Sequence, residues 1–219
     1  MNEIKKGYED SKNIKWWSEH YNEQKERQFI KKIIESIPDS GDKLLDIGCG
    51  IGMHSFIFKN LGKNVIALDY SKKMCDYAKN HYGLDVIRGD ALKLPFTSEK
   101  FDITFTCGLS TIVGDEDIRI KSVREMRRIT KKGGYIILST PSDKSIYFKF
   151  KKDSLHHLDD RDEGILQKEK LDVISTIYWG ILPGFMWKNL ILRIMAKFLE
   201  LFSRSRYIGI RKVVICRKK

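Results

Sequence analysis

Three glycines that alternate with single residues place the strongest constraint on what this chain can fold into. Residues 44–52 read LLDIGCGIG, so a short apolar run ends in an acid and is followed by the glycines. Residues 53–58, MHSFIF, then read as the start of a helix. Strand, glycine turn and helix is the order in which an α/β protein brings its backbone close to a nucleotide-like ligand.

The spacing of the glycines narrows the class of ligand. A dinucleotide fingerprint has the pattern G-x-G-x-x-G, whereas here the pattern is G-x-G-x-G behind an acid. No Lys-Ser/Thr pair follows, which argues against a phosphate-binding P-loop, and the spacing argues weakly against NAD. A tight structural turn without a ligand is the alternative interpretation.

Apolar runs and helical periodicity alternate along the chain. They predict strands at 43–47, 65–68, 85–88, 101–106, 135–140 and 207–216, with a further strand-like stretch within 171–182. They predict helices at 23–37, 52–60, 71–81, 115–130 and 185–202, and a loop or short helix within 141–165. This alternation predicts an α/β protein with a mostly parallel sheet and helices on both faces.

The composition is that of one globular domain. We expect residues 1–219 to form a single domain with a helical N-terminal cap at 1–40, a cofactor-binding core at 41–141 and a substrate-side part at 142–219. The polar first residues contain no apolar leader, which predicts a cytoplasmic protein. The cysteines are far apart and contain no C-x-x-C pair, so we expect free thiols and no metal site.

Three acids each come at the end of an apolar run: Asp46, Asp69 and Asp90. Because the carboxyl ends of parallel strands meet at one edge of a sheet, the three carboxylates should converge on one crevice. Asp69 comes 23 positions after Asp46, about where an acid can bind both hydroxyls of a ribose. A single acid at a strand end is more often a turn-former, but three in register favour a binding site.

The chain resembles the class I S-adenosylmethionine-dependent methyltransferases of the small "type 11" kind. The residues that carry the resemblance are LLDIGCGIG (44–52), VIALDYS (65–71), VIRGDALKLPF (86–96), FDITFTCGLS (101–110) and REMRRITKKGGYIILSTP (124–141). The resemblance implies a Rossmann-like methyltransferase fold, with a seven-stranded sheet in the order 3-2-1-4-5-7-6 whose last strand is antiparallel. It also implies S-adenosyl-L-methionine as cofactor and S-adenosyl-L-homocysteine as product.

The resemblance assigns cofactor contacts residue by residue. The glycine turn would approach the methionine part of the cofactor, through Asp46, Gly48, Cys49, Gly50 and Gly52. Asp69 would hold the ribose, with Tyr70 beside the adenine. Asp90 would bind the adenine amino group, with the backbone of Ala91 close by. Cys107 and Gly108 fall where the fourth strand opens towards the sulfonium.

The acceptor is not identified by these motifs. The sequence at the fourth strand lacks the Asn/Asp-Pro-Pro-Tyr motif of many enzymes that methylate nucleic-acid amines. Methyl transfer does not require a general base, but if one is used the candidates are His156, His157 and His20. The alternative for each histidine is an ordinary surface residue with no catalytic role. We expect methyl transfer to an oxygen, nitrogen or carbon of a lipophilic small molecule. A tRNA or other RNA methyltransferase and a non-catalytic cofactor-binding partner protein are the alternatives.

The basic excess of the chain is concentrated near its C-terminus. The net charge is +12, and residues 184–219 alone contain 10 Lys and Arg against 1 Glu. Within them, residues 185–202 predict a helix that is apolar except for one narrow polar stripe. This helix could pack within the fold or a dimer interface, cap an apolar substrate pocket, or rest on an anionic membrane surface. The basic residues also fit RNA, which we consider the less favoured partner, and the oligomeric state stays open.

Overall fold

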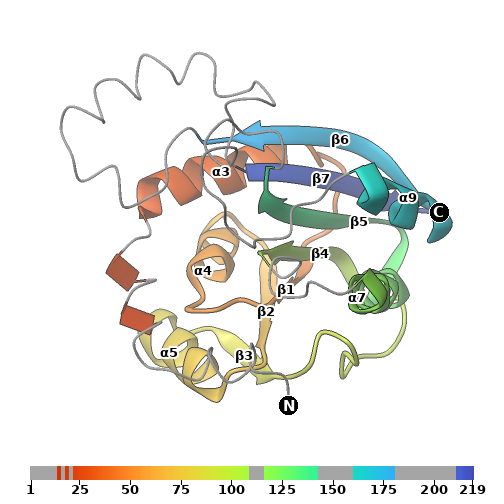
Figure 1. The fold of residues 1–219 in the computed structure, drawn as a ribbon. Coiled ribbons are helices and arrows are strands. Elements are labelled where there is room, and N and C mark those ends of the chain that lie inside the picture. The colour runs from red at the N-terminus through yellow and green to blue at the C-terminus, as the bar shows by residue number, and fades with distance from the viewer. Residues whose placement is uncertain (1–13, 16–17, 20–21, 109–115, 143–159, 181–210) are drawn as a thin grey trace, which may run out of the picture.

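The structure, a computed structural model, describes residues 14–15, 18–19, 22–108, 116–142, 160–180 and 211–219. Within them lies one seven-stranded sheet in the order β3-β2-β1-β4-β5-β7-β6. The strands are β1 (Lys43–Ile47), β2 (Asn64–Asp69), β3 (Asp85–Arg88), β4 (Phe101–Cys107), β5 (Thr130–Pro141), β6 (Leu171–Trp179) and β7 (Arg211–Lys218). The helices labelled in Figure 1 are α3 (Glu23–Glu35), α4 (Met53–Asn60), α5 (Lys72–Tyr82), α7 (Glu116–Ile129) and α9 (Asp160–Lys168).

The first five strands of the sheet are parallel, and β7 is the exception. It lies antiparallel between β5 and β6, whereas β1 pairs in parallel with β2 and β4. The predicted Rossmann-like fold, with its strand order and antiparallel last strand, is therefore confirmed. The parallel arrangement puts the carboxyl ends of β1 to β5 at the same edge of the sheet, which is where such folds bind ligands.

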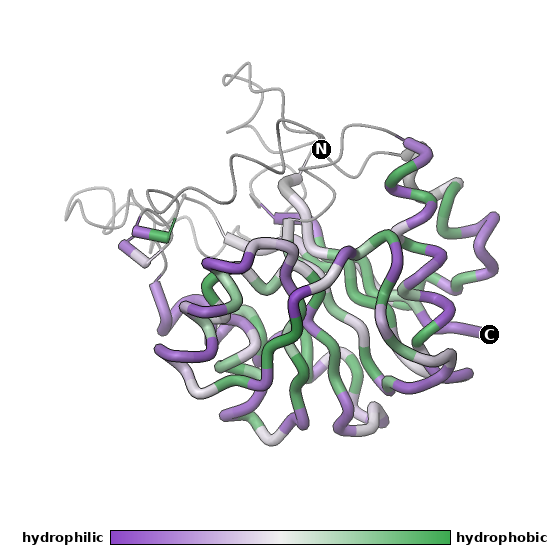
Figure 2. Tube along the Cα trace, turned by 90° about the horizontal axis from the view of Figure 1, so that it is seen from below, coloured by the Kyte–Doolittle hydropathy of each residue, from purple (hydrophilic) through white to green (hydrophobic). Residues whose placement is uncertain are grey.

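Helices cover both faces of the sheet, as Figure 1 shows. Helices α3, α4 and α5 lie on one face, and α7 and α9 lie on the other. Each face has its own apolar core, one built around Phe29, Ile57 and Phe105 and the other around Leu45 and Met126. Figure 2 shows hydrophobic residues along the central strands and hydrophilic ones on the outer turns. Burial on both faces explains why the central strands read as continuous apolar runs.

The element boundaries differ from the prediction mainly in the second half of the chain. Strand β5 begins at Thr130, five residues earlier than expected, because α7 leads directly into it. The Thr130 hydroxyl donates to the backbone oxygen of Met126 at 2.7 Å, which joins the end of the helix to the strand. Strand β7 (Arg211–Lys218) extends two residues beyond the predicted end at 216, and the predicted residues 207–210 lie outside the described residues. The predicted helix at 185–202 lies outside the described residues.

No helix in the described part of the chain is long and apolar enough to cross a membrane.

Helix α4 begins immediately after the glycine turn, and its N-cap is Gly52. This residue has a φ of +89°, a conformation that costs a residue with a Cβ about 1–2 kcal/mol. A Cβ added here would lie 2.7 Å from the Cβ of Ala78 and 2.8 Å from the Cδ1 of Leu84. Two separate constraints therefore require glycine at this position, one on backbone conformation and one on space.

We predict that Gly52→Ala lowers the free energy of unfolding by about 2–5 kcal/mol, because strain and overpacking add together. Gly62→Ala is a matched control, since Gly62 has a nearly identical φ of +88° but open space around the added Cβ. The control should lose only about 1–2 kcal/mol from backbone strain. Urea denaturation followed by circular dichroism measures both values, and equal losses would contradict the packing argument.

Candidate functional site

The glycine turn is held against the end of β2 by backbone hydrogen bonds. The amide of Gly48 donates to the carbonyl of Leu68 at 2.7 Å, and the amide of Gly50 donates to Oδ2 of Asp69 at 2.8 Å. Gly48, Gly50 and Gly52 all have positive φ, at 74°, 54° and 89°. An added Cβ at Gly50 would meet nothing within 4 Å, so the middle of the turn faces open space. The turn therefore combines a fixed backbone with room for a ligand.

Asp69 is the residue that orders this edge of the sheet. Its Oδ2 accepts the Gly50 amide and its Oδ1 accepts the Ser71 amide at 2.8 Å. A carboxylate accepts hydrogen bonds and donates none, so this type of group suits a ligand that carries hydroxyls. The neighbouring Tyr70 accepts a hydrogen bond at its carbonyl from Nε of Arg88, whose guanidinium lies 5.9 Å from the Tyr70 ring centroid.

Asp90 lies at the same edge, one strand further along. The amide of Gly89 donates to the carbonyl of Asp69 at 2.9 Å, which joins the end of β3 to the end of β2. Oδ1 of Asp90 accepts the Leu92 amide at 2.9 Å, and Ala91 between them packs against the second core. The structure thus brings Asp69 and Asp90 to the edge that carries the glycine turn, as the parallel strand pattern predicts.

Asp46 is placed differently from the other two acids. Only 1% of its surface is exposed, whereas Asp69 and Asp90 are partly exposed. Ser55 donates a hydrogen bond to its Oδ2 at 2.5 Å. Burial raises the pKa of Asp46 to about 6, helped by the charge of Asp69 and opposed by His54 and Ser55. Its carboxylate therefore supports the turn from inside the fold.

Cys49 is a buried part of the turn itself. Its amide donates to the carbonyl of Leu68 at 3.0 Å, and its Sγ lies 3.6 Å from the carbonyl oxygen of Gly50. Burial, with the charges of Asp46 and Asp69, raises the pKa of this thiol well above its ordinary value. Cys49 is therefore a neutral packing residue at physiological pH.

Cys107 and Gly108 end β4 on the other side of β1. The thiol of Cys107 contacts the Ser139 hydroxyl at 3.6 Å, and the Gly108 amide donates to the Ser139 carbonyl at 2.8 Å. Burial raises the pKa of Cys107 despite the nearby guanidinium of Arg211, so the thiol stays protonated. Near the ends of β4 and β5, Cys107 is thus partly exposed and Ser139 is buried beneath it.

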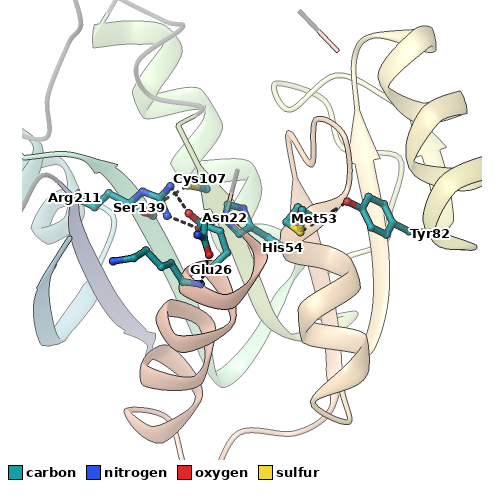
Figure 3. Close-up of polar contacts among 9 residues, drawn as sticks. Asn22, Glu26, Met53, His54, Tyr82, Cys107, Ser139 and Arg211 are labelled. Atoms are coloured by element: carbon teal, nitrogen blue, oxygen red, sulfur yellow. Dashed lines mark hydrogen bonds and ion pairs between the residues drawn. The ribbon is translucent and has the colours of Figure 1, made fainter. Parts of the chain in front are cut away.

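A buried charged cluster next to these groups was not predicted from the sequence. Glu26 of α3 binds Arg211 of β7 through two hydrogen bonds, at 2.6 and 2.9 Å, and lies 2.8 Å from Nε2 of His54 in α4. Figure 3 shows the three side chains pointing toward one another, beside Cys107 and Ser139. One sequence signal was present, because Glu26 shares the apolar helix face of Phe29, Ile30 and Ile33.

The charges of this cluster balance one another. Burial alone would raise the pKa of Glu26, but Arg211 and His54 outweigh it and hold this pKa at about 2. An ionised carboxylate only accepts hydrogen bonds. Nε2 of His54 must therefore carry the ring hydrogen and donate the hydrogen bond to Glu26. The cluster is therefore an ion pair extended by an imidazole, in which Glu26 and His54 are buried and Arg211 is partly exposed.

Three predicted candidates for a general base, His20, His156 and His157, lie outside the described residues. Among the residues that the structure does describe, no three His, Cys, Asp or Glu side chains gather in a way that could hold a metal ion.

The chain matches a family model across the region that builds this site. Residues 45–138 match the family described as "Methyltransferase domain". The resemblance inferred from the sequence motifs is therefore confirmed for this region, which runs from β1 to β5.

Curated relatives align with about half of the chain. A demethylmenaquinone methyltransferase from Renibacterium salmoninarum is 32% identical over 115 residues, covering 52% of this chain and 46% of the relative. A malonyl-[acyl-carrier protein] O-methyltransferase from Erwinia pyrifoliae is 34% identical over 130 residues, covering 58% and 48%. The chain thus spans about half the length of the curated relatives it matches.

Solved structures share the fold over nearly the whole chain. A SAM-dependent methyltransferase from Archaeoglobus fulgidus superimposes with a TM-score of 0.70 at 16% identity, over 95% of this chain and 100% of that one. Magnesium protoporphyrin IX methyltransferase from Synechocystis PCC 6803, with bound SAM, gives 0.68 at 14% identity, over 100% and 99%. At such identities these matches establish that the methyltransferase domain has the fold of its neighbours.

We predict that Asp46→Asn stabilises the folded protein at alkaline pH. The folded-state pKa of about 6 lies above the ordinary 3.8. The fold therefore favours the protonated carboxyl. The free energy of unfolding falls as the pH rises from the ordinary pKa of 3.8 through the folded-state pKa of about 6. Asparagine keeps an oxygen that can accept from Ser55, removes the buried charge, and should add about 1–3 kcal/mol at pH 8. Urea denaturation at pH 5 and pH 8 tests this: the gain should shrink at pH 5, and a less stable variant at pH 8 would contradict it.

Proposed function

We propose that this protein is an S-adenosylmethionine-dependent methyltransferase that acts on a small-molecule nucleophile. The observation that carries the proposal is the Gly50–Asp69 hydrogen bond, which joins an open glycine turn to an acid inside a methyltransferase domain. The curated relatives named above are methyltransferases whose names state small-molecule or carrier-bound acceptors. The structural neighbours include a methyltransferase with bound SAM.

The residues along this edge of the sheet would contact the methionine, ribose and adenine parts of the cofactor in that order. The turn from Gly48 to Gly52 offers backbone and open space to the methionine part. As a carboxylate, Asp69 would accept hydrogen bonds from the ribose hydroxyls, and Tyr70, the next residue, would lie beside the adenine ring. Asp90 and the Ala91 backbone, joined to Asp69 through Gly89, would then meet the adenine amino group.

The acceptor would approach from the side of β4 and β5. There Cys107 is the last residue of β4, Gly108 follows it, and Ser139 lies near the end of the neighbouring strand β5. Bound S-adenosylmethionine supplies an activated methyl group, and the protein has to hold the nucleophile in line with it and exclude water. Alignment of two reactants in this way can lower the barrier by about 7–11 kcal/mol.

The chemistry of the acceptor stays a prediction: an oxygen, nitrogen or carbon nucleophile on a lipophilic molecule, with a general base among His20, His156 and His157. A cytoplasmic location and contact of residues 185–202 with an anionic membrane also stay predictions.

We predict that Asp69→Ala reduces the affinity for S-adenosylhomocysteine by at least about tenfold, or 1.4 kcal/mol. The substitution removes both the ribose acceptor and the bond that holds the Gly50 amide. Asp85→Ala is a control, because Asp85 is an exposed residue at the opposite end of β3. Isothermal titration calorimetry measures both variants against the wild type, and equal affinities would contradict the assignment of Asp69.

Turnover is tested with methyl-labelled S-adenosylmethionine and a fractionated lysate. Label in an organic-soluble or small-molecule fraction supports the proposal. Label in RNA would instead favour an RNA methyltransferase, and cofactor binding without labelled product would favour a non-catalytic partner protein.

A further inference from the structure

The loop that follows β3 is held by a charged pair from α7, a helix on the opposite face of the sheet from α4 and α5 (Figure 1). Glu125 and Arg128 lie one helical turn apart. Nε and Nη2 of Arg128 donate to the two carboxylate oxygens of Glu125 at 2.7 and 2.8 Å. A forked pair of this kind has a defined geometry, because both charged groups are planar.

Both members of this pair also bind the backbone of Leu94. The Leu94 amide donates to Oε2 of Glu125 at 2.8 Å, and Nη2 of Arg128 donates to the Leu94 carbonyl at 3.1 Å. Nη1 of Arg128 donates to the carbonyl of Phe96 at 2.7 Å. The hydrogen bonds from Arg128 hold the pKa of Glu125 below its ordinary value, although partial burial opposes them. The pair therefore supplies three hydrogen bonds to a segment that belongs to no helix or strand.

The segment held by this pair continues into the turn at Asp90. The Lys93 amide donates to the Asp90 carbonyl at 3.0 Å, and the Leu92 amide donates to Oδ1 of Asp90 at 2.9 Å. Leu94 comes next, and it is only 4% exposed within the core on the α7 face. The position of the Asp90 turn is therefore set at one end by β3 and at the other by the charged pair of α7.

We propose that Arg128, paired with Glu125, is a positioning residue for the adenine end of the cofactor. It holds Leu94 and Phe96 so that the Asp90 turn stays where the adenine amino group would meet it. This inference rests on the proposed function, because it concerns the same cofactor. It gives α7 a part in a site that the ends of β1, β2 and β3 otherwise build.

The geometry explains why this role suits arginine. The Arg128 guanidinium makes four hydrogen bonds, two to Glu125 and one each to the carbonyls of Leu94 and Phe96. A lysine carries one compact ammonium group in place of this planar fork and cannot reproduce its geometry. Lysine at position 128 would thus keep a charge opposite Glu125 while losing part of the hold on the loop. Because hydrogen bonds weaken steeply with poor geometry, a loosely held Asp90 turn would bind the adenine amino group less well.

A second arginine of α7 provides a matched control. Arg124, one turn before Arg128, donates through Nε and Nη2 to Oε1 of Glu169 at 3.1 and 2.8 Å. Glu169 is the residue after α9, so this pair joins α7 to the end of α9. Loss of Arg124 therefore measures what a broken arginine–glutamate pair on α7 does by itself.

The test compares S-adenosylhomocysteine with S-inosylhomocysteine, which has a carbonyl oxygen in place of the adenine amino group, by isothermal titration calorimetry. We expect the wild type to prefer S-adenosylhomocysteine by about tenfold or more, because the analogue cannot donate this hydrogen bond to Asp90. In Arg128→Met the preference should fall to about threefold or less through weaker binding of S-adenosylhomocysteine, and Arg128→Lys should lie between the two. Arg124→Met should keep the wild-type preference.

A role of Arg128 in folding alone makes a different prediction. Arg128→Met would then lower the melting temperature while its preference between the two ligands stayed that of the wild type, and this result would overturn the inference. Circular dichroism establishes that each variant is folded at the temperature of the titration. Arg128→Lys, which keeps the charge, supplies the comparison if Arg128→Met does not fold, and a wild-type preference in Arg128→Lys would then overturn the inference.

The wild-type protein separates this inference from the proposed function. A wild type that binds neither ligand would overturn the proposed function, and this inference with it. A wild type that binds both ligands equally well would leave the proposed function standing, but it would overturn the assignment of Asp90 to the adenine amino group and the role of Arg128 that depends on it.

Discussion

The hydrogen bond from the Gly50 amide to Asp69 is the contact on which the rest of the site depends. It joins the turn after β1 to the end of β2, and so converts two neighbouring strands into one binding edge. The geometry is available only because three glycines adopt positive φ, which a residue with a Cβ would adopt at a cost. The same carboxylate holds the Ser71 amide at the start of α5, so one side chain organises the turn and the following helix.

The two halves of the sheet contribute to the site in different ways. Around β1, β2 and β3, the site residues come within a few positions of a strand end, and neighbouring strands are close in sequence. Around β4, β5 and β7, the polar groups come from segments that are far apart, as in the pair of Glu26 and Arg211, 185 positions from each other. The first half thus forms a local, repeated unit, whereas the second half depends on the long-range arrangement of the chain.

This difference explains how much the sequence could predict. Apolar runs located β1 to β4 to within one or two residues, because strands buried on both faces must be continuously apolar. The strand order came from the family resemblance, since local pattern does not determine which strand lies beside β7. Asp46 lies one residue before the end of β1, as predicted, but the apolar run did not show that its carboxylate would be buried against Ser55 of α4.

The Glu26 cluster could not be predicted from spacing, yet its physics shows why it fits this position. Burial of an ion pair costs desolvation energy, and a well-packed apolar trio would often stabilise a fold equally well. Here, however, Glu26 of α3 contacts His54 of α4 and forms two hydrogen bonds with Arg211 of β7. A bidentate Arg–carboxylate pair adds directional contacts that an apolar trio does not have. The charged cluster therefore fixes how α3 lies against the helix that follows the glycine turn and against β7.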